Sequence, residues 1–93
     1  MPSLVSSADL ATQLASLPGW SREGISIRKT YTFKDFAAAI AFINAVAVRA
    51  EAADHHPDLL LHGWNKVDVI LSTHSAGGIT QNDFALARAI DSV

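Results

Sequence analysis

The stretch Ile-Ser-Ile-Arg-Lys-Thr-Tyr-Thr-Phe at residues 25–33, with the apolar segment that follows it, decides the fold class. Large apolar residues alternate with polar ones in this stretch, which is typical of a half-buried β-strand. From residue 34 to residue 54 the apolar positions recur three or four residues apart, which predicts a helix about 30 Å long. Thr32 and Asp35 resemble a capping box at its start. The stripe that we expect to face the core is Phe36, Ile40, Ile43 and Ala47, widened by Ala39, Phe42 and Val46.

On the N-terminal side, residues 7–17 predict a short helix that Pro18-Gly19 ends. A short strand is expected at residues 20–22, and the turn Glu23-Gly24 joins it to the strand described above as a hairpin.

On the C-terminal side, Pro57 cannot continue the long helix. Strands are predicted from residue 59 and over residues 66–73, and Thr80 with Asp83 predicts a capping box that opens a last helix. The order α-β-β-α-β-β-α indicates an α+β fold, in which a four-stranded antiparallel sheet carries the helices on one face.

The composition limits the classes of protein that the chain can form. Its 93 residues predict a single domain over residues 1–93, and 49% hydrophobic residues exclude a disordered chain. The net charge of −2 argues against nucleic acid as the main ligand, and the absence of cysteine excludes disulfides. The longest uncharged central run, residues 36–48, is shorter than a membrane span of about 20 residues, so no membrane is expected. Met1–Leu4 lack the pattern of a signal peptide, so we expect a cytoplasmic protein.

Three of the four histidines lie between positions 55 and 62. Glu51 precedes His55 by one helical turn, so its carboxylate could hold one ring nitrogen of His55, whereas His56 points elsewhere. His74 ends a predicted strand and Asp83 begins a predicted helix. Imidazoles and carboxylates that converge on one cleft can move protons near neutral pH.

Each of these residues also has a purely structural interpretation. His55 could cap a helix C-terminus and Asp83 could serve only in the capping box. Trp20 could be a core aromatic residue, and His62 is expected at the surface. A zinc or iron site is the main chemical alternative, but helical metal ligands are spaced three or four apart, so adjacent His55 and His56 argue against a metal.

The spacing of these residues resembles the signature of the pterin-4a-carbinolamine dehydratases, also called 4a-hydroxytetrahydrobiopterin dehydratases. The resemblance lies in Glu-Ala-Ala-Asp-His-His-Pro at residues 51–57, followed by Trp64, His74 and Asp83. The segments Thr32–Phe36, Asn65–Val67, Leu71–His74 and Gly78–Thr80 also resemble this family, as does Gly19-Trp20.

The resemblance implies a hydro-lyase that dehydrates 4a-hydroxytetrahydropterin to a quinonoid dihydropterin, without metal or cofactor. This reaction recycles the tetrahydrobiopterin cofactor of aromatic amino acid hydroxylases. By resemblance, His55 and His74 are the acid/base pair, His56 positions the substrate and Asp83 orients a histidine. The residues expected to bind the pterin are Glu51, Asp54, Pro57, Ser72, Thr73 and, as a stacking wall, Trp20.

Two other functions stay open. Some animal members of the family stabilise dimers of a homeodomain transcription factor, so the chain could be a regulatory module, and a dehydratase acting on a related pterin would carry a similar signature. The long helix is apolar around most of its girth, which predicts a homodimer or homotetramer.

Overall fold

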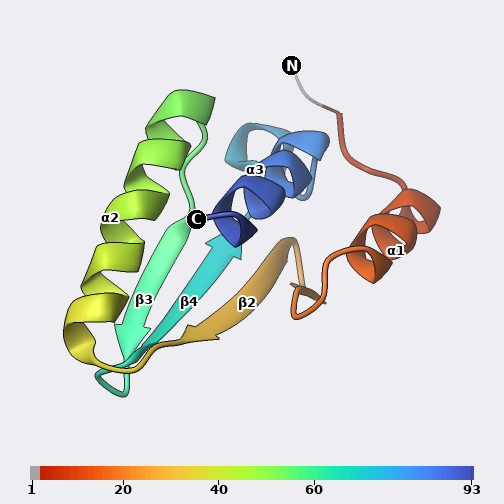
Figure 1. The fold of residues 1–93 in the computed structure, drawn as a ribbon. Helices are drawn as coiled ribbons and strands as arrows, with labels where there is room; N and C mark the ends of the chain where they lie inside the picture. Colours follow the sequence, from red (N-terminus) through yellow and green to blue (C-terminus); the bar gives the residue numbers. More distant parts are fainter. Residues whose placement is uncertain (1–2) are drawn as a thin grey trace.

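A computed structural model describes residues 3–93 and shows a four-stranded antiparallel sheet with helices on one face (Figure 1). The strand order is β1-β2-β4-β3, and the predicted α+β fold class and element order are confirmed. Met1 and Pro2, part of the segment on which the signal-peptide prediction rests, lie outside the described residues. The elements are α1 Ser7–Ala15, β1 Ser21–Glu23, β2 Ser26–Thr32, α2 Phe36–Ala53, β3 Asp58–His62, β4 Lys66–Leu71, the 3-10 turn η1 His74–Ala76 and α3 Gln81–Asp91.

The two central strands form the floor of the core. Ile27 of β2 lies opposite Leu71 of β4, and both side chains are fully buried beneath the helices. Val67 and Val69 of β4 are also fully buried, as the alternation of the sequence predicts. The paired part of β2 begins at Ser26 because Gly24, with a φ of +62°, and the exposed Ile25 make the hairpin turn.

Helix α2 begins at Phe36, two residues later than the sequence pattern predicts. Asp35 is the residue that caps it, and the Asp35 carboxylate accepts a hydrogen bond of 2.7 Å from the Ala38 N–H. The predicted capping box led by Thr32 is therefore wrong, since Asp35 occupies the capping position itself. The helix ends at Ala53, because Asp54 adopts the left-handed conformation with a φ of +48°.

The face of α2 that packs on the sheet matches the predicted stripe only in part, since Ala39, Phe42 and Val46 are buried as expected. Phe36 and Ile40 are 53% and 37% exposed, so they do not face the core. Phe42 faces the core instead. Its ring centroid lies 4.6 Å from that of Tyr31 and 4.9 Å from that of Phe33. Small alanines beside Phe42 allow the helix to approach the strands closely. The buried residues of α2 are Ala39, Phe42, Val46 and Ala50.

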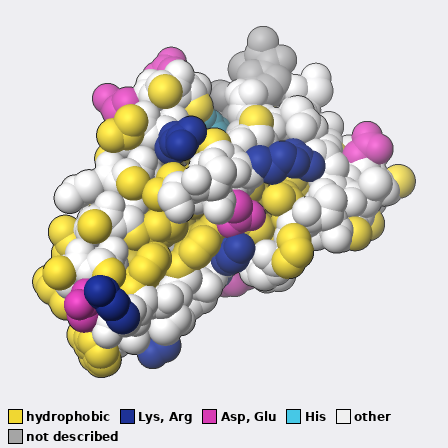
Figure 2. All heavy atoms as spheres, in the orientation of Figure 1, with side chains coloured by type: hydrophobic (Ala, Val, Ile, Leu, Met, Phe, Trp, Pro, Cys, Tyr) yellow, Lys and Arg dark blue, Asp and Glu magenta, His cyan; other side chains and the backbone are white. Residues whose placement is uncertain are grey.

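Much of α2 is left apolar and uncovered by the rest of the chain. Within residues 3–93, α2 alone has the length and composition of a membrane span, with 18 residues and a mean hydropathy of 1.5. The uncharged run at residues 36–48 is shorter than this helix, so the sequence estimate was too short. The core helix of a folded domain can have the same length and apolar composition. Figure 2 shows apolar side chains in yellow at the left of the view, where α2 lies in Figure 1.

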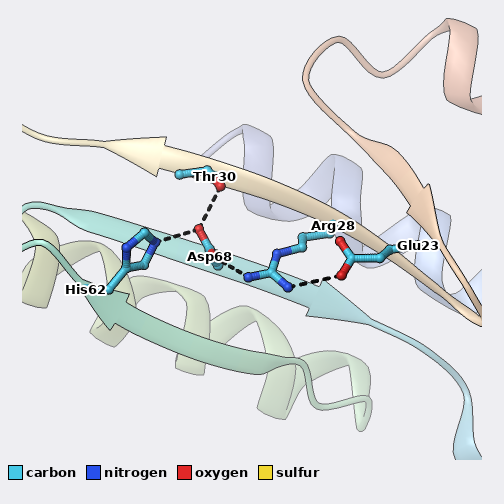
Figure 3. A network of polar contacts seen from close by, with 5 residues as sticks. All are labelled: Glu23, Arg28, Thr30, His62 and Asp68. Atoms are coloured by element: carbon cyan, nitrogen blue, oxygen red, sulfur yellow. Dashed lines mark hydrogen bonds and ion pairs between the residues drawn. The ribbon is translucent and has the colours of Figure 1, made fainter.

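The face of the sheet away from the helices carries a polar network centred on Asp68 (Figure 3). Asp68 is only 4% exposed, and it accepts hydrogen bonds from Thr30 at 2.6 Å and from Arg28, which also contacts Glu23. His62 lies at the surface as predicted, with a side chain that is 41% exposed, and its Nε2 lies 2.9 Å from Asp68 Oδ1. Burial raises the pKa of Asp68, but the hydrogen bonds from Thr30, Arg28 and His62 outweigh burial and lower it well below its usual range.

Candidate active site

A pocket of about 240 Å³ opens where the C-terminal end of α2, the end of β4 and the turn η1 meet. Three of the four histidines line this pocket, although they are separated by up to 19 positions in the sequence. The carboxylate of Asp54 and the three-residue segment around Thr73 complete its wall. The lining residues are Asp54, His55, His56, Ser72, Thr73, His74 and Ser75.

His55 and Asp83 form a close pair beside this pocket. His55 Nε2 lies 2.6 Å from Asp83 Oδ1, and the two side chains are 13% and 0% exposed. A carboxylate can only accept a hydrogen bond, so Nε2 carries the proton and Nδ1 keeps a free lone pair when the ring is neutral. The pair therefore has the arrangement that supports a histidine as a proton acceptor.

Asp83 is also the capping-box partner of Thr80 that the sequence predicts. Its Oδ2 accepts a hydrogen bond of 2.9 Å from the Thr80 N–H and one of 2.8 Å from the Thr73 hydroxyl. The capping box and the histidine contact use different oxygens of one carboxylate, so the two interpretations of Asp83 are compatible. This explains why a fully buried carboxylate is tolerated, since both oxygens have partners.

The predicted contact between Glu51 and His55 is wrong. Glu51 Oε2 instead lies 2.5 Å from His56 Nε2, and both of these side chains are more than half exposed. The cause is the left-handed Asp54, which ends the helical phase and turns His55 toward α3. Glu51 and His55 are therefore not on one continuous helix, and the rule that residues four apart share a helix face does not apply to them.

His74 begins the turn η1 and faces solvent at the pocket. The carbonyl oxygen of Thr73 accepts hydrogen bonds of 3.1 and 3.0 Å from the N–H groups of Ala76 and Gly77, which close the turn. Gly77 has a φ of +76°, a conformation that glycine adopts without strain. Within residues 3–93, no side chain forms a hydrogen bond with the His74 imidazole, which leaves both ring nitrogens available to a ligand.

The remaining predicted residues divide into three groups. Glu51 and Pro57 line a neighbouring apolar pocket of about 230 Å³, which shares His56 with the first pocket. The Ser72 hydroxyl lines the first pocket but donates to the carbonyl oxygen of Ile25 at 2.8 Å. Trp20 is not brought to the histidines, which corrects its prediction as a stacking wall. Trp20 is 5% exposed and belongs to the core, and its Nε1 donates a hydrogen bond of 3.0 Å to Asp91.

Asp91 gathers three donors at the far end of α3. The Trp20 indole, the Lys29 ammonium and the Tyr31 hydroxyl all donate to its carboxylate. Burial raises the pKa of Asp91, but the hydrogen bonds from Tyr31, Lys29 and Trp20 outweigh burial and lower it. These hydrogen bonds link the C-terminal end of α3 to β2, and they therefore help to fix the helix that carries Asp83 at its N-terminal end.

The sequence pattern did not place Ser75 or Thr80 at the site. Ser75 lines the pocket because η1 turns the chain back directly after His74. Thr80 was predicted only as a helix cap, but its N–H also holds the Asp83 carboxylate that contacts His55. The position of Asp83 three residues later was the sequence signal for this contact. Within the described part of the chain, no three histidine, aspartate or glutamate side chains are arranged to hold a metal ion.

Comparisons with known proteins agree on one family. Residues 3–93 match the family model described as pterin 4 alpha carbinolamine dehydratase. A protein of Chloroflexus aurantiacus, provisionally named pterin-4-alpha-carbinolamine dehydratase, is 52% identical over 93 residues, which is 100% of this chain and 98% of that protein.

Two solved structures have a similar fold. The crystal structure titled transcriptional coactivator/pterin dehydratase from Brucella melitensis has a TM-score of 0.91 and 34% identity, covering 97% of each chain. A pterin dehydratase-like protein identified as a RuBisCO assembly factor in the alpha-carboxysome has a TM-score of 0.62 and 23% identity. That comparison covers 78% of this chain and 83% of the other, and at this identity it shows the fold alone.

Proposed function

Because the chain belongs to the pterin 4 alpha carbinolamine dehydratase family, we propose that it removes water from 4a-hydroxytetrahydropterin and releases a quinonoid dihydropterin. The single observation that supports this most is the His55–Asp83 pair beside a pocket that His56 and His74 also line. In this proposal the product is a dihydropterin, and a separate reducing enzyme must return it to the tetrahydropterin pool.

The chemistry requires two proton transfers. A carbinolamine carries its hydroxyl group on the carbon bonded to a ring nitrogen. When the hydroxyl leaves, it takes a proton and departs as water, while the nitrogen loses a proton and its electron pair forms the carbon–nitrogen double bond. An acid and a base on either side of that bond therefore accelerate the step without a further reactant.

We assign the base to His55 and the acid to His74. The Asp83 carboxylate lies against His55 Nε2, so it stabilises the imidazolium that forms when Nδ1 accepts the proton from the ring nitrogen. His74 is exposed and lines the same pocket, and in this proposal it donates a proton to the leaving hydroxyl. His56, held by Glu51 at 2.5 Å, is placed to orient the pterin, with Asp54 and the backbone of residues 72 and 73 beside it.

The alternative is a module without catalysis that acts by binding another protein. The fold alone does not decide between these functions, since the same fold occurs in the carboxysome assembly factor. A binding module would not need two carboxylate-paired histidines and a third free histidine at one pocket. A dehydratase of a related pterin would use the same residues, so the choice between the two substrates requires an activity assay with each of them.

A homo-oligomer is part of the proposal. Val48 of α2 is 69% exposed, and Phe36 and Ile40 extend the same kind of apolar surface toward the start of the helix. Apolar surface of this extent on one helix is typical of an interface between subunits. We expect a second copy of the chain to cover it, as a dimer or a tetramer.

The experiment is a steady-state assay of purified protein with 4a-hydroxytetrahydropterin. We expect His55→Ala and His74→Ala to lower turnover at least about tenfold, because removal of a general acid or base has effects of this size or larger. His62→Gln is the matched control, since His62 lies on the other face of the sheet and should retain activity. Unchanged turnover in folded His55→Ala and His74→Ala would contradict the proposal.

A further inference from the structure

A continuous chain of buried hydrogen bonds runs from Thr80 through Thr73 to Asp83. The Thr73 and Thr80 hydroxyl oxygens lie 2.7 Å apart, and Thr73 Oγ1 lies 2.8 Å from Asp83 Oδ2. These residues are 5%, 0% and 0% exposed in the order Thr73, Thr80, Asp83. Water therefore has little access to the chain, and the protein groups must satisfy one another.

The direction of the protons follows from the donors available. A carboxylate only accepts, so the single hydroxyl proton of Thr73 goes to Asp83 Oδ2. The Thr80 hydroxyl must then donate to Thr73, while Thr80 Oγ1 accepts from the Asn82 N–H at 3.3 Å. Every donor in the chain is directed toward the Asp83 carboxylate, and such aligned hydrogen bonds strengthen one another.

This alignment fixes which oxygen of Asp83 faces the pocket. Oδ2 is occupied by the Thr73 hydroxyl and the Thr80 N–H, so Oδ1 remains for His55 Nε2. The carbonyl oxygen of Thr73 meanwhile accepts the N–H groups that close the turn carrying His74. Thr73 is therefore bonded both to the partner of His55 and to the segment that carries His74.

We propose that Thr73 is a positioning residue, whose hydroxyl holds the Asp83 carboxylate so that His55 keeps its proton on Nε2 and presents Nδ1 to the substrate. This rests on the proposed dehydratase function for its effect on the reaction, but the tautomer of His55 does not depend on that function. The family resemblance assigned Thr73 to the pterin pocket, partly through its backbone, whereas its buried hydroxyl donates to Asp83. Without this hydroxyl, Asp83 Oδ2 keeps only the hydrogen bond from the Thr80 N–H, so the carboxylate is held less firmly and the neutral His55 ring can place its proton on either nitrogen.

The test compares Thr73→Val, which keeps the side-chain shape, with Thr73→Ser, which keeps the hydroxyl. We expect Thr73→Val to lower kcat about tenfold with a smaller change in KM, as for other residues that orient a reacting group through a second one. Thr73→Ser should return kcat to within about threefold of the original protein by restoring the donor. Thr32→Val is the control, because Thr32 is exposed on the strand face away from the helices.

Nitrogen-15 NMR of the histidine rings supplies a readout that does not require activity. The original protein and Thr73→Ser should show neutral His55 with its proton on Nε2, and Thr73→Val should show a mixture of the two tautomers. An unchanged tautomer together with an unchanged kcat in Thr73→Val would overturn the proposal. If the protein lacks dehydratase activity but the tautomer still shifts, the proposed function fails while the positioning role of Thr73 stands.

Thr73→Val could fail to fold, and a measurement on the unaltered protein then decides. A hydroxyl proton that is bonded within the buried chain exchanges slowly with water, so a resolved Thr73 hydroxyl resonance is expected. Fast exchange of this proton with solvent would show that the hydroxyl does not hold Asp83 and would overturn the proposal.

Discussion

Replacement of Asp68 by asparagine tests how the polar network of Figure 3 stabilises the sheet. Asp68→Asn keeps the shape of the side chain but removes the negative charge that Arg28, Thr30 and His62 surround. A buried hydrogen bond to a charged group contributes ~1.5–3 kcal/mol. The Arg28 and His62 side chains are 32% and 41% exposed, so water screens part of their contribution.

We therefore expect Asp68→Asn to lower the free energy of unfolding at pH 7 by about 2 kcal/mol. A domain of this size loses about 4–8 °C of Tm per kcal/mol, so Tm should fall by roughly 10 °C. Thermal unfolding followed by circular dichroism measures this change. Asp58→Asn is the matched control, because Asp58 is an exposed carboxylate on the same face of the sheet. It should shift the free energy of unfolding by less than about 0.5 kcal/mol.

The effect should depend on pH with a definite sign. The pKa of Asp68 is lowered in the folded protein, whereas an aspartate in the unfolded chain titrates near ~3.9. As the pH falls below about 4, the unfolded state binds a proton before the folded state does, so the stabilisation by Asp68 is lost. The difference between the two proteins should shrink by about 1 kcal/mol between pH 6 and pH 3. A difference that is absent at pH 7, or equal at pH 6 and pH 3, would refute this reasoning.

Two further predictions concern the core and the subunit interface. Trp20→Phe removes the hydrogen bond to Asp91 and should lower the free energy of unfolding by about 1 kcal/mol. KM for the pterin should not change, and an increased KM would show that Trp20 reaches the substrate after all. Val48→Glu places a charge on the apolar surface of α2 and should reduce the mass measured by light scattering to that of a 9.9 kDa monomer. A monomer mass for the unaltered protein at micromolar concentration would contradict the predicted homo-oligomer.

The fold was predictable because its signals are local. The element order followed from the alternation over residues 25–33 and from the helix-ending residues Pro18-Gly19 and Pro57. The start of α3 followed from Thr80 and Asp83. The buried face of α2 was predicted in part. Ala39, Phe42 and Val46 are buried as expected, but Phe36 and Ile40 are exposed, since helical spacing alone could not decide between stripes that differ by one position. The arrangement of strands decided it, because Tyr31 and Phe33 receive Phe42 rather than Phe36.

The site was predictable as a set of residues but not as a set of contacts. The signature spacing indicated the three histidines and Asp83, and the structure brings the histidines to one pocket with Asp83 behind His55. The pairing of Glu51 with His55 failed because one left-handed residue, Asp54, changes the direction of the chain. The hydroxyl of Thr73 left no sequence signal, since its bond to Asp83 joins two elements that only folding brings together.

The most direct test of the proposed function is the rate at which the purified protein dehydrates 4a-hydroxytetrahydropterin, measured beside the His74→Ala variant. We predict enzymatic turnover for the original protein and at least about a tenfold loss in a variant whose circular dichroism spectrum is unchanged. Equal rates for the two folded proteins, or no acceleration over the uncatalysed reaction by either, would contradict the proposal that these histidines catalyse the dehydration.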